Sequence, residues 1–157
     1  GCIIFSILRE LKHSRAVGVD ICKKTITNAR KNLINMDLQN RVKLLHKPID
    51  KVIGYKFDLI VSNPPYVEKR EINRLSQDIK SYEPRSALDG GNDGLDVIRK
   101  VIYKSKHILK SNGILALEIG NGQQKEVIKM LSDNNFKLKE KVKDYQSNVR
   151  CIFSTLI

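Results

Sequence analysis

Apolar residues along the chain follow two spacings that alternate, one typical of helices and one typical of strands. Recurrence every three to four positions predicts amphipathic helices at residues 2–12, 23–36, 95–110 and 123–131. Short apolar or alternating runs predict strands at residues 16–19, 42–45, 57–61, 114–119, 136–143 and 149–157. This order predicts a doubly wound α/β sheet that is mostly parallel, with an antiparallel hairpin at its C-terminal edge.

The run Phe57–Val61 and the residues after it stand out from this pattern. The run is almost wholly apolar, which is typical of a strand buried on both faces in a parallel sheet. It leads directly into Ser62 and the tetrapeptide Asn63-Pro64-Pro65-Tyr66. Residues 67–94 are polar and interrupted by proline and glycine, so we expect a long excursion that is either functional or disordered.

In doubly wound sheets, ligands bind beyond the carboxyl ends of the strands. Asp20, the turn at Asn63–Tyr66 and the stretch after Glu118 all follow strand ends, so we expect them on one rim of the sheet. The chain has 157 residues, the length of one domain that buries about 70% of its unfolded surface. We therefore expect a single domain over residues 1–157, with residues 67–94 as an excursion from it.

The charge of the chain is strongly positive but spread along it. Its 29 Lys and Arg outnumber its 17 Asp and Glu, for a formal net charge of +12. Net charge governs encounter and non-specific attraction, so it is weak evidence for a nucleic-acid surface. The lysines that alternate along residues 137–143 are typical of a sheet edge at which charge prevents further strand pairing.

No apolar run approaches the roughly 18 residues of a membrane span, which favours a cytoplasmic protein without a membrane partner.

The cysteines Cys2, Cys22 and Cys151 lie far apart, with no CxxC spacing and no nearby pair of histidines. They predict neither a disulfide framework nor a zinc site. We expect small buried thiols and no bound metal.

Asp20 and the proline turn carry the candidate chemistry. Asp20 ends its strand before a helix, where a carboxylate either accepts the hydroxyls of a nucleotide ribose or caps the helix, and the sequence leaves both roles open.

The two prolines after Asn63 fix the backbone and remove two N–H groups, so the turn presents carbonyl oxygens. The Asn63 carboxamide oxygen and the Pro64 carbonyl can accept hydrogen bonds from a substrate NH2, and Tyr66 can stack on the planar group that bears it. Such a site orients the lone pair of a poor nitrogen nucleophile toward an electrophile without a strong base.

The segment Phe57–Tyr66 resembles motif IV of the S-adenosylmethionine-dependent methyltransferases that modify planar nitrogens of DNA adenine, rRNA guanine or glutamine. Other segments resemble the HemK/PrmC protein-(glutamine-N5) methyltransferases, namely Tyr82–Leu88, Gly90–Leu95, Leu117–Gly120 with Gln123, and Asp144-Tyr145 with Asn148 and Arg150. The resemblance extends over essentially the whole chain. It implies a class I, Rossmann-like methyltransferase domain that transfers a methyl group from S-adenosylmethionine to the glutamine of the Gly-Gly-Gln loop in class-1 peptide chain release factors.

The resemblance also implies roles for single residues. Asp20 would hold the cofactor ribose, with Gly1 and Asn63 also at the cofactor. The substrate site would comprise Asn63, Pro64, Pro65 and Tyr66, of which Asn63 and Pro64 would hold the amide nitrogen and Tyr66 would pack on the amide plane. These three, Asn63, Pro64 and Tyr66, are the candidate catalytic residues.

Several other residues of the resemblance have more open roles. Glu118 and Gln123 are expected to be scaffold for the site, and Arg150 is expected to be structural. For Glu83 and Arg85, a structural ion pair and a contact with the substrate both stay open.

The chain departs from the family pattern in two places. Family members carry, before the first helix, a strand with an acidic end and a glycine-rich turn for the methionine part of the cofactor, whereas this chain begins at Gly1. We therefore expect a truncated domain without its first strand, which would lie between the strands ending at Asp20 and Ser62, and weak cofactor binding by the chain alone. The acidic stretch that contacts adenine is replaced by residues 46–50, where Asp50 is a possible substitute.

Two rival functions stay open. One is a DNA or RNA amino-N methyltransferase that acts on adenine N6 or guanine N2, which the turn and the basic charge favour. We identify no base-flipping or groove-reading element, so nucleic acid is the less expected substrate. The other rival is an inactive fragment that retains only binding surfaces. The oligomeric state is not predicted.

Overall fold

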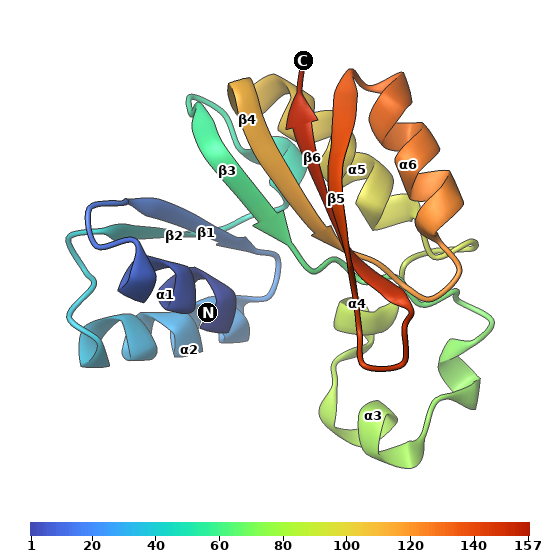
Figure 1. The fold of residues 1–157 in the computed structure, drawn as a ribbon. Helices are drawn as coiled ribbons and strands as arrows, with labels where there is room; N and C mark the ends of the chain where they lie inside the picture. The colour runs from blue at the N-terminus through green and yellow to red at the C-terminus, as the bar shows by residue number, and fades with distance from the viewer. The chain divides into compact units, whose positions relative to one another are not determined.

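The computed structural model describes residues 1–157 and divides them into two compact units, Gly1–Val52 and Ile53–Ile157. We call them the N-terminal unit and the C-terminal unit. Both combine parallel strands with helices (Figure 1).

The N-terminal unit is a pair of parallel strands with two helices on one side. Its elements are α1 (Cys2–Glu10), β1 (Ala16–Asp20), α2 (Lys23–Asn35), β2 (Val42–His46) and the short 3-10 helix η1 (Ile49–Lys51). The strands pair in register from Ala16 opposite Val42 to Asp20 opposite His46. The apolar stripes of the helices and the adjoining chain form the core, made of Phe5, Leu8, Ala29, Leu33, Leu38 and Val42.

The C-terminal unit is built on a four-stranded sheet. Its elements are β3 (Phe57–Ser62), η2 (Ile72–Arg74), α3 (Gln77–Tyr82), α4 (Arg85–Leu88), α5 (Asp96–Ile108), β4 (Leu109–Glu118), α6 (Gln124–Asp133), β5 (Phe136–Lys143) and β6 (Val149–Leu156). The strand order is β3-β4-β6-β5. β3 and β4 are parallel, and β6 runs antiparallel between β4 and β5.

Helices α5 and α6 pack against this sheet and against each other (Figure 1). Fully buried aliphatic side chains from the helices meet those of β4 and β6, and they include Ile98, Ile102, Val127, Leu131, Leu115, Leu117 and Ile152. This core fixes the end of β4 and therefore the rim from which the site is built.

The predicted α/β class is confirmed, including the mostly parallel strands and the antiparallel C-terminal hairpin. The lysine-bearing strand β5 lies at the edge of its sheet with Lys137, Lys139, Lys141 and Lys143 exposed, as the alternation predicts. None of the helices has the length and hydropathy that a bilayer span requires, since the longest have 13 residues.

The prediction that residues 57–61 are buried on both faces was wrong. Leu59 is 37% exposed and Val61 is 39% exposed. β3 pairs with β4 on one side only, so it is an edge strand of its sheet.

Two further predictions differ from the structure. Asn112-Gly113 is not the boundary between helix and strand, because α5 ends at Ile108 and β4 already begins at Leu109. Asn112 instead has a positive φ of 61° within β4, where the pairing with β3 shifts register. The excursion at residues 67–94 contains the short helices η2, α3 and α4 rather than loop alone.

The buried position of Leu117 predicts a large loss of stability on truncation. Leu117→Ala should lower the free energy of unfolding by about 2–5 kcal/mol, because it removes apolar contacts and leaves a cavity under the sheet. Leu59→Ala is the matched control on the neighbouring strand and should cost less than about 1.5 kcal/mol, since that side chain is already partly in water. Chemical denaturation of both variants tests this, and equal losses would contradict the assigned burial.

Candidate functional site

The site begins where β3 leaves the sheet. Ser62, its last residue, pairs with Leu117, and the chain then turns through Asn63-Pro64-Pro65-Tyr66. The two ends of the excursion are fastened together directly after this turn. The Val67 N–H donates to the Leu88 carbonyl at 3.0 Å, and the Gly90 N–H donates to the Val67 carbonyl at 2.9 Å. The excursion is therefore anchored beside the turn at both ends.

Gln123 holds the backbone of the turn from the segment after β4. Its side-chain Nε2 donates to the Tyr66 carbonyl at 3.0 Å and to the Gly94 carbonyl at 3.3 Å. Its Oε1 accepts a hydrogen bond from the Gly120 N–H at 2.8 Å. One carboxamide thus joins three segments, which confirms the scaffold role expected of Gln123.

Two glycines allow this close approach. Gly94 has a φ of +73°, and a Cβ there would collide with the Tyr66 carbonyl oxygen. A Cβ on Gly120 would lie 2.9 Å from the Gln123 Oε1 and 3.2 Å from the Tyr66 ring. Gly94 therefore requires the absence of a side chain, whereas a side chain at Gly120 would push the Gln123 carboxamide out of its position.

A charged network holds the hydroxyl of Tyr66. Arg150 Nη2 donates to this hydroxyl at 2.8 Å, and the Arg150 Cζ lies 5.2 Å from the ring centroid. The Tyr66 hydroxyl donates to Glu118 Oε1 at 3.3 Å. Arg150 also lies 3.8 Å from the Glu118 carboxylate and 3.9 Å from the Asp144 carboxylate. The turn and the stretch from Glu118 onward thus meet on one rim, as expected, and Arg150 has the predicted structural role.

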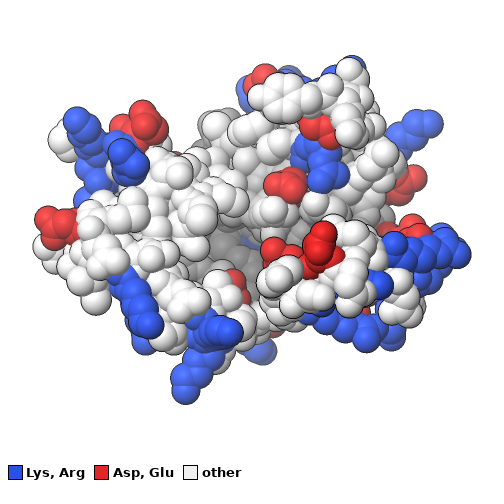
Figure 2. Space-filling view, turned by 90° about the horizontal axis from the view of Figure 1, so that it is seen from below, with Lys and Arg blue, Asp and Glu red and all other residues white.

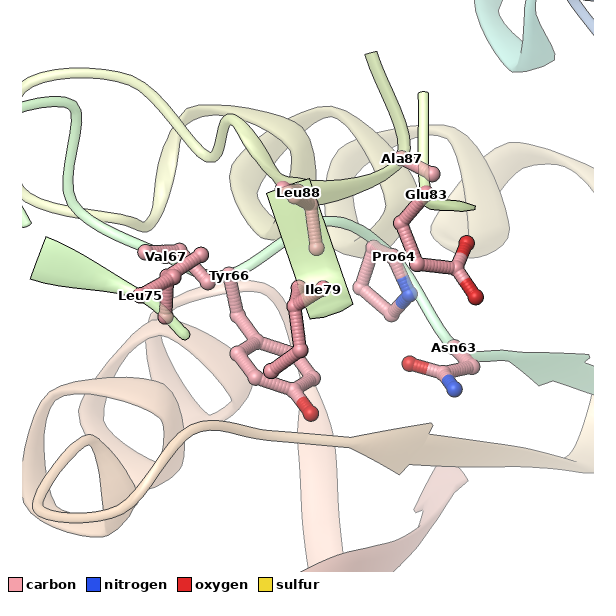
Figure 3. A pocket seen from close by; sticks show the side chains of 9 residues that line it. All are labelled: Asn63, Pro64, Tyr66, Val67, Leu75, Ile79, Glu83, Ala87 and Leu88. Atoms are coloured by element: carbon pink, nitrogen blue, oxygen red, sulfur yellow. The ribbon is translucent and has the colours of Figure 1, made fainter. Parts of the chain in front are cut away.

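A pocket of about 560 Å³ opens beside the turn. Residues of the turn and of the excursion line it, namely Asn63, Pro64, Tyr66, Val67, Leu75, Ile79, Glu83, Ala87 and Leu88 (Figure 3). Pro64 is buried and Asn63 is exposed. Neither the Asn63 carboxamide nor the Pro64 carbonyl makes a hydrogen bond within the chain. Two oxygen acceptors therefore have no partner within the chain, and both belong to residues that line a mostly apolar pocket.

The structure shows whether Glu83 and Arg85 form an ion pair with each other. Arg85 lies 3.7 Å from the Asp89 carboxylate, one helical turn further along the chain, and forms its ion pair there. Glu83 has neither an ion pair nor a side-chain hydrogen bond, although it lines the pocket. The structural Glu83–Arg85 pair that the sequence left open does not form.

Asp20 ends β1 in the N-terminal unit. Its Oδ1 accepts a hydrogen bond of 2.7 Å from the Cys22 N–H, which orders the chain just before α2. Its other carboxylate oxygen has no partner, so an acceptor remains for a ligand hydroxyl. Gly1 is exposed before α1, and Asp50 is exposed beside Lys51 at 4.0 Å.

The expectation of buried thiols was wrong. Cys2 is exposed, and Cys22 and Cys151 are half-buried. Hydrogen bonds from the Thr25 side chain and from backbone N–H groups lower the pKa of the Cys22 thiol, whereas burial raises the pKa of the Cys151 thiol.

Hydrogen bonds from Arg99 lower the pKa of Asp93 in the excursion. No group of three His, Cys, Asp or Glu residues is placed to hold a metal ion.

The positive charge does not gather into one continuous surface on the face drawn in Figure 2. Lys and Arg side chains stand there in small separate groups, with uncharged surface and several acidic side chains between them. On this face the charge is dispersed, as it is along the sequence.

Residues 6–149 match a protein-family model described as Eco57I restriction-modification methylase. The chain is 41% identical to a release factor glutamine methyltransferase from Fusobacterium nucleatum, over 98% of this chain and 44% of that protein. It is 39% identical to a release factor glutamine methyltransferase from Clostridium acetobutylicum, over 98% of this chain and 55% of that protein. The chain thus spans about half the length of the curated relatives it matches.

Solved structures share the fold at much lower identity. A methyltransferase from Pyrococcus furiosus matches with a TM-score of 0.67 and 13% identity, over 98% of this chain and 68% of that one. The N-methyltransferase NodS from Bradyrhizobium japonicum, solved in complex with S-adenosyl-L-homocysteine, matches with a TM-score of 0.59 and 14% identity, over 90% of this chain and 66% of that one. These matches show the class I methyltransferase fold that the sequence predicts.

Removal of the Gln123 carboxamide should destabilise the C-terminal unit. Gln123→Leu leaves the Gly120 N–H and the Tyr66 and Gly94 carbonyls without their partner, and each such group costs about 1–3 kcal/mol when buried. We expect a loss of at least about 2 kcal/mol in the free energy of unfolding by chemical denaturation. Gln124→Leu, one residue on, is the control and should change stability by less than about 0.5 kcal/mol. A loss in Gln123→Leu no larger than in this control would show that the three bonds do not hold the turn.

Proposed function

We propose a function for this chain, which belongs to the Eco57I restriction-modification methylase family. The chain carries the acceptor site of an S-adenosylmethionine-dependent methyltransferase that modifies a glutamine side-chain nitrogen. The substrate is the glutamine of the Gly-Gly-Gln loop in class-1 peptide chain release factors, a proposal supported by the names of its relatives. Because release factors act in translation, we place the reaction in the cytoplasm.

The pair of unpartnered acceptors in the pocket carries this proposal. A primary amide has two N–H groups, and the Asn63 oxygen and the Pro64 carbonyl offer one acceptor to each. No basic side chain lines the pocket, and none is needed to bind a neutral amide. The pocket volume of about 560 Å³ lies in the range of small-molecule sites and is sufficient for one side chain with its flanking backbone.

Holding both N–H groups also favours the reaction itself. The amide nitrogen is a poor nucleophile because its lone pair is delocalised into the carbonyl. Two fixed acceptors orient the nitrogen, and they interact more strongly with its N–H groups as positive charge develops there. The nitrogen–carbon bond forms as the sulfur–carbon bond breaks, and the extra proton on nitrogen leaves to solvent. Tyr66 would support the amide plane, since its ring lines the same pocket.

One carboxylate of the N-terminal unit suits the cofactor that this reaction requires. S-adenosylmethionine, when bound, supplies a methyl group activated by the sulfonium. Asp20 would accept the ribose hydroxyls through the carboxylate oxygen that has no partner in the chain, as an acid at a strand end does in dinucleotide-binding folds. Residues 67–94 would contact the substrate, because six of the lining residues belong to that segment.

A nucleic-acid amino group is the second candidate substrate, because the description of the matching family model names a restriction-modification methylase. An exocyclic amine of adenine presents the same two N–H groups to the turn. The relatives that match 98% of this chain favour glutamine. Incubation of the full-length protein and labelled S-adenosylmethionine with a release factor, and separately with DNA and RNA, distinguishes these substrates. Label on nucleic acid alone would overturn the proposal.

Removal of the Asn63 acceptor should reduce methyl transfer without unfolding the chain. Asn63→Ala in the full-length protein should lower the rate of glutamine methylation at least about 100-fold, equivalent to about 2.7 kcal/mol of transition-state stabilisation. Mass spectrometry of the release factor after timed reactions measures this rate. Asn28→Ala, an exposed asparagine of α2, should leave the rate unchanged. Retained turnover in Asn63→Ala would remove Asn63 from the mechanism.

Loss of charge at Asp20 should weaken cofactor binding. Asp20→Asn keeps an oxygen for the Cys22 N–H but presents an NH2 group to one ribose hydroxyl, so we expect the dissociation constant for S-adenosylmethionine to rise at least about tenfold. Calorimetric titration of the full-length protein measures the change. Asp37→Asn removes an equal charge after α2 and should have no effect. Equal affinities for the wild type and Asp20→Asn would exclude Asp20 from the cofactor site.

A further inference from the structure

We propose that Glu83 selects substrates in which a positively charged side chain lies beside the acceptor glutamine. The inference rests on the proposed function, since it concerns the peptide that enters the same pocket. It adds a specificity-determining residue outside the turn, and it requires a basic residue next to the glutamine of the substrate.

Glu83 is the charged residue of an otherwise uncharged pocket. The eight other lining residues are aliphatic, proline, tyrosine or asparagine. In Figure 3 the Glu83 carboxylate and the Asn63 carboxamide lie at the same end of the pocket, next to Pro64. A group that contacts Glu83 would therefore be close to the amide that the turn holds.

The carboxylate of Glu83 is available to a ligand. Four other acidic side chains of the excursion each pair with a nearby arginine, in the pairs Glu68–Arg70, Glu71–Arg74, Asp89–Arg85 and Asp93–Arg99. Glu83 has no such partner, even though Arg85 is two residues away and the chain has 29 basic residues. Asp78 of the same segment is also unpaired but does not line the pocket, so Glu83 is the unpaired acid that a ligand in the pocket would meet.

The stability of the fold does not account for a glutamate here. Glu83 is the C-terminal cap of α3, and its backbone N–H donates to the Ile79 carbonyl at 2.9 Å. A negative charge at a helix C-terminus is unfavourable, because the carbonyl groups there already carry partial negative charge. The side chain is exposed and packs in no core. A role toward a bound group explains its presence better than a role in folding.

An arginine or lysine of a peptide matches this arrangement. Its cationic head would pair with the carboxylate, and its aliphatic stem would lie along the apolar wall that includes Ile79 and Ala87. A phosphate beside the reacting group would meet like charge at the same point. The single acidic group therefore favours a basic peptide loop over a nucleic acid at this pocket.

Peptide binding to the full-length protein tests the inference. Three fluorescent peptides share a central Gly-Gly-Gln and carry arginine, norleucine or glutamate next to it, and their dissociation constants are measured by anisotropy at low salt. We expect the wild type to bind the arginine peptide about three- to tenfold more tightly than the norleucine peptide. Glu83→Gln should abolish this preference, and Glu83→Lys should transfer it to the glutamate peptide.

Asp78→Asn provides the matched control. Asp78 lies on the same helix, is exposed, has no ion pair and does not line the pocket, so the variant loses the same charge at another place. It should keep the preference for arginine. Equal binding of all peptides by the wild type, no detectable binding of any peptide, or an equal loss of preference in Asp78→Asn would each overturn the assignment to Glu83.

Methyl transfer to the same peptides separates this inference from the proposed function. Transfer to glutamine without any preference for the arginine peptide refutes the role of Glu83 and leaves the proposed reaction intact. A preference in binding that depends on Glu83, without methylation of the glutamine, refutes the reaction and retains the charge selection.

Discussion

The fixing of Tyr66 by Gln123 and Arg150 is the constraint on which the site depends. Gln123 holds the Tyr66 carbonyl across 57 residues of sequence, and Arg150 holds its hydroxyl across 84 residues. The two prolines before Tyr66 have no N–H groups, so neither can donate to an acceptor of the turn. The scaffold therefore engages the far end of the turn and leaves the oxygens of Asn63 and Pro64 free. Acceptors without a partner in the chain suit the proposed transfer, in which nearby dipoles stabilise the charge that develops on nitrogen.

Much of this architecture could be predicted from local sequence. The spacing of apolar residues located the helices and strands, because an amphipathic element records its buried face in the chain itself. The turn was equally evident, since two prolines after an asparagine restrict the backbone wherever they occur. The meeting of this turn with the stretch after Glu118 followed from the rule that parallel strands end on a common rim. These features depend on neighbours in sequence or on general topology.

The features that could not be predicted depend on partners distant in sequence or on competition between neighbours. An apolar run such as residues 57–61 does not reveal whether a strand flanks it on each side, and in this structure Leu59 and Val61 are partly exposed. The contact of Arg150 with Tyr66 has no local signal. The sequence left open whether Glu83 and Arg85 form an ion pair or contact the substrate, whereas in the structure the helical turn of α4 brings Arg85 to Asp89. The free carboxylate in the pocket is thus a consequence of three-dimensional structure.

Free acceptors in the turn and one free acid in an apolar pocket are the observations behind the proposed site for a neutral amide on a basic peptide. The capture of the amide NH2 is the central claim, and nuclear magnetic resonance of a Gly-Gly-Gln peptide labelled with ¹⁵N at the glutamine side chain tests it most directly. On binding to the full-length protein, both carboxamide protons should shift downfield and exchange more slowly with water, because each donates to a fixed oxygen. A peptide that binds while both carboxamide signals keep their free positions and exchange rates would contradict the account.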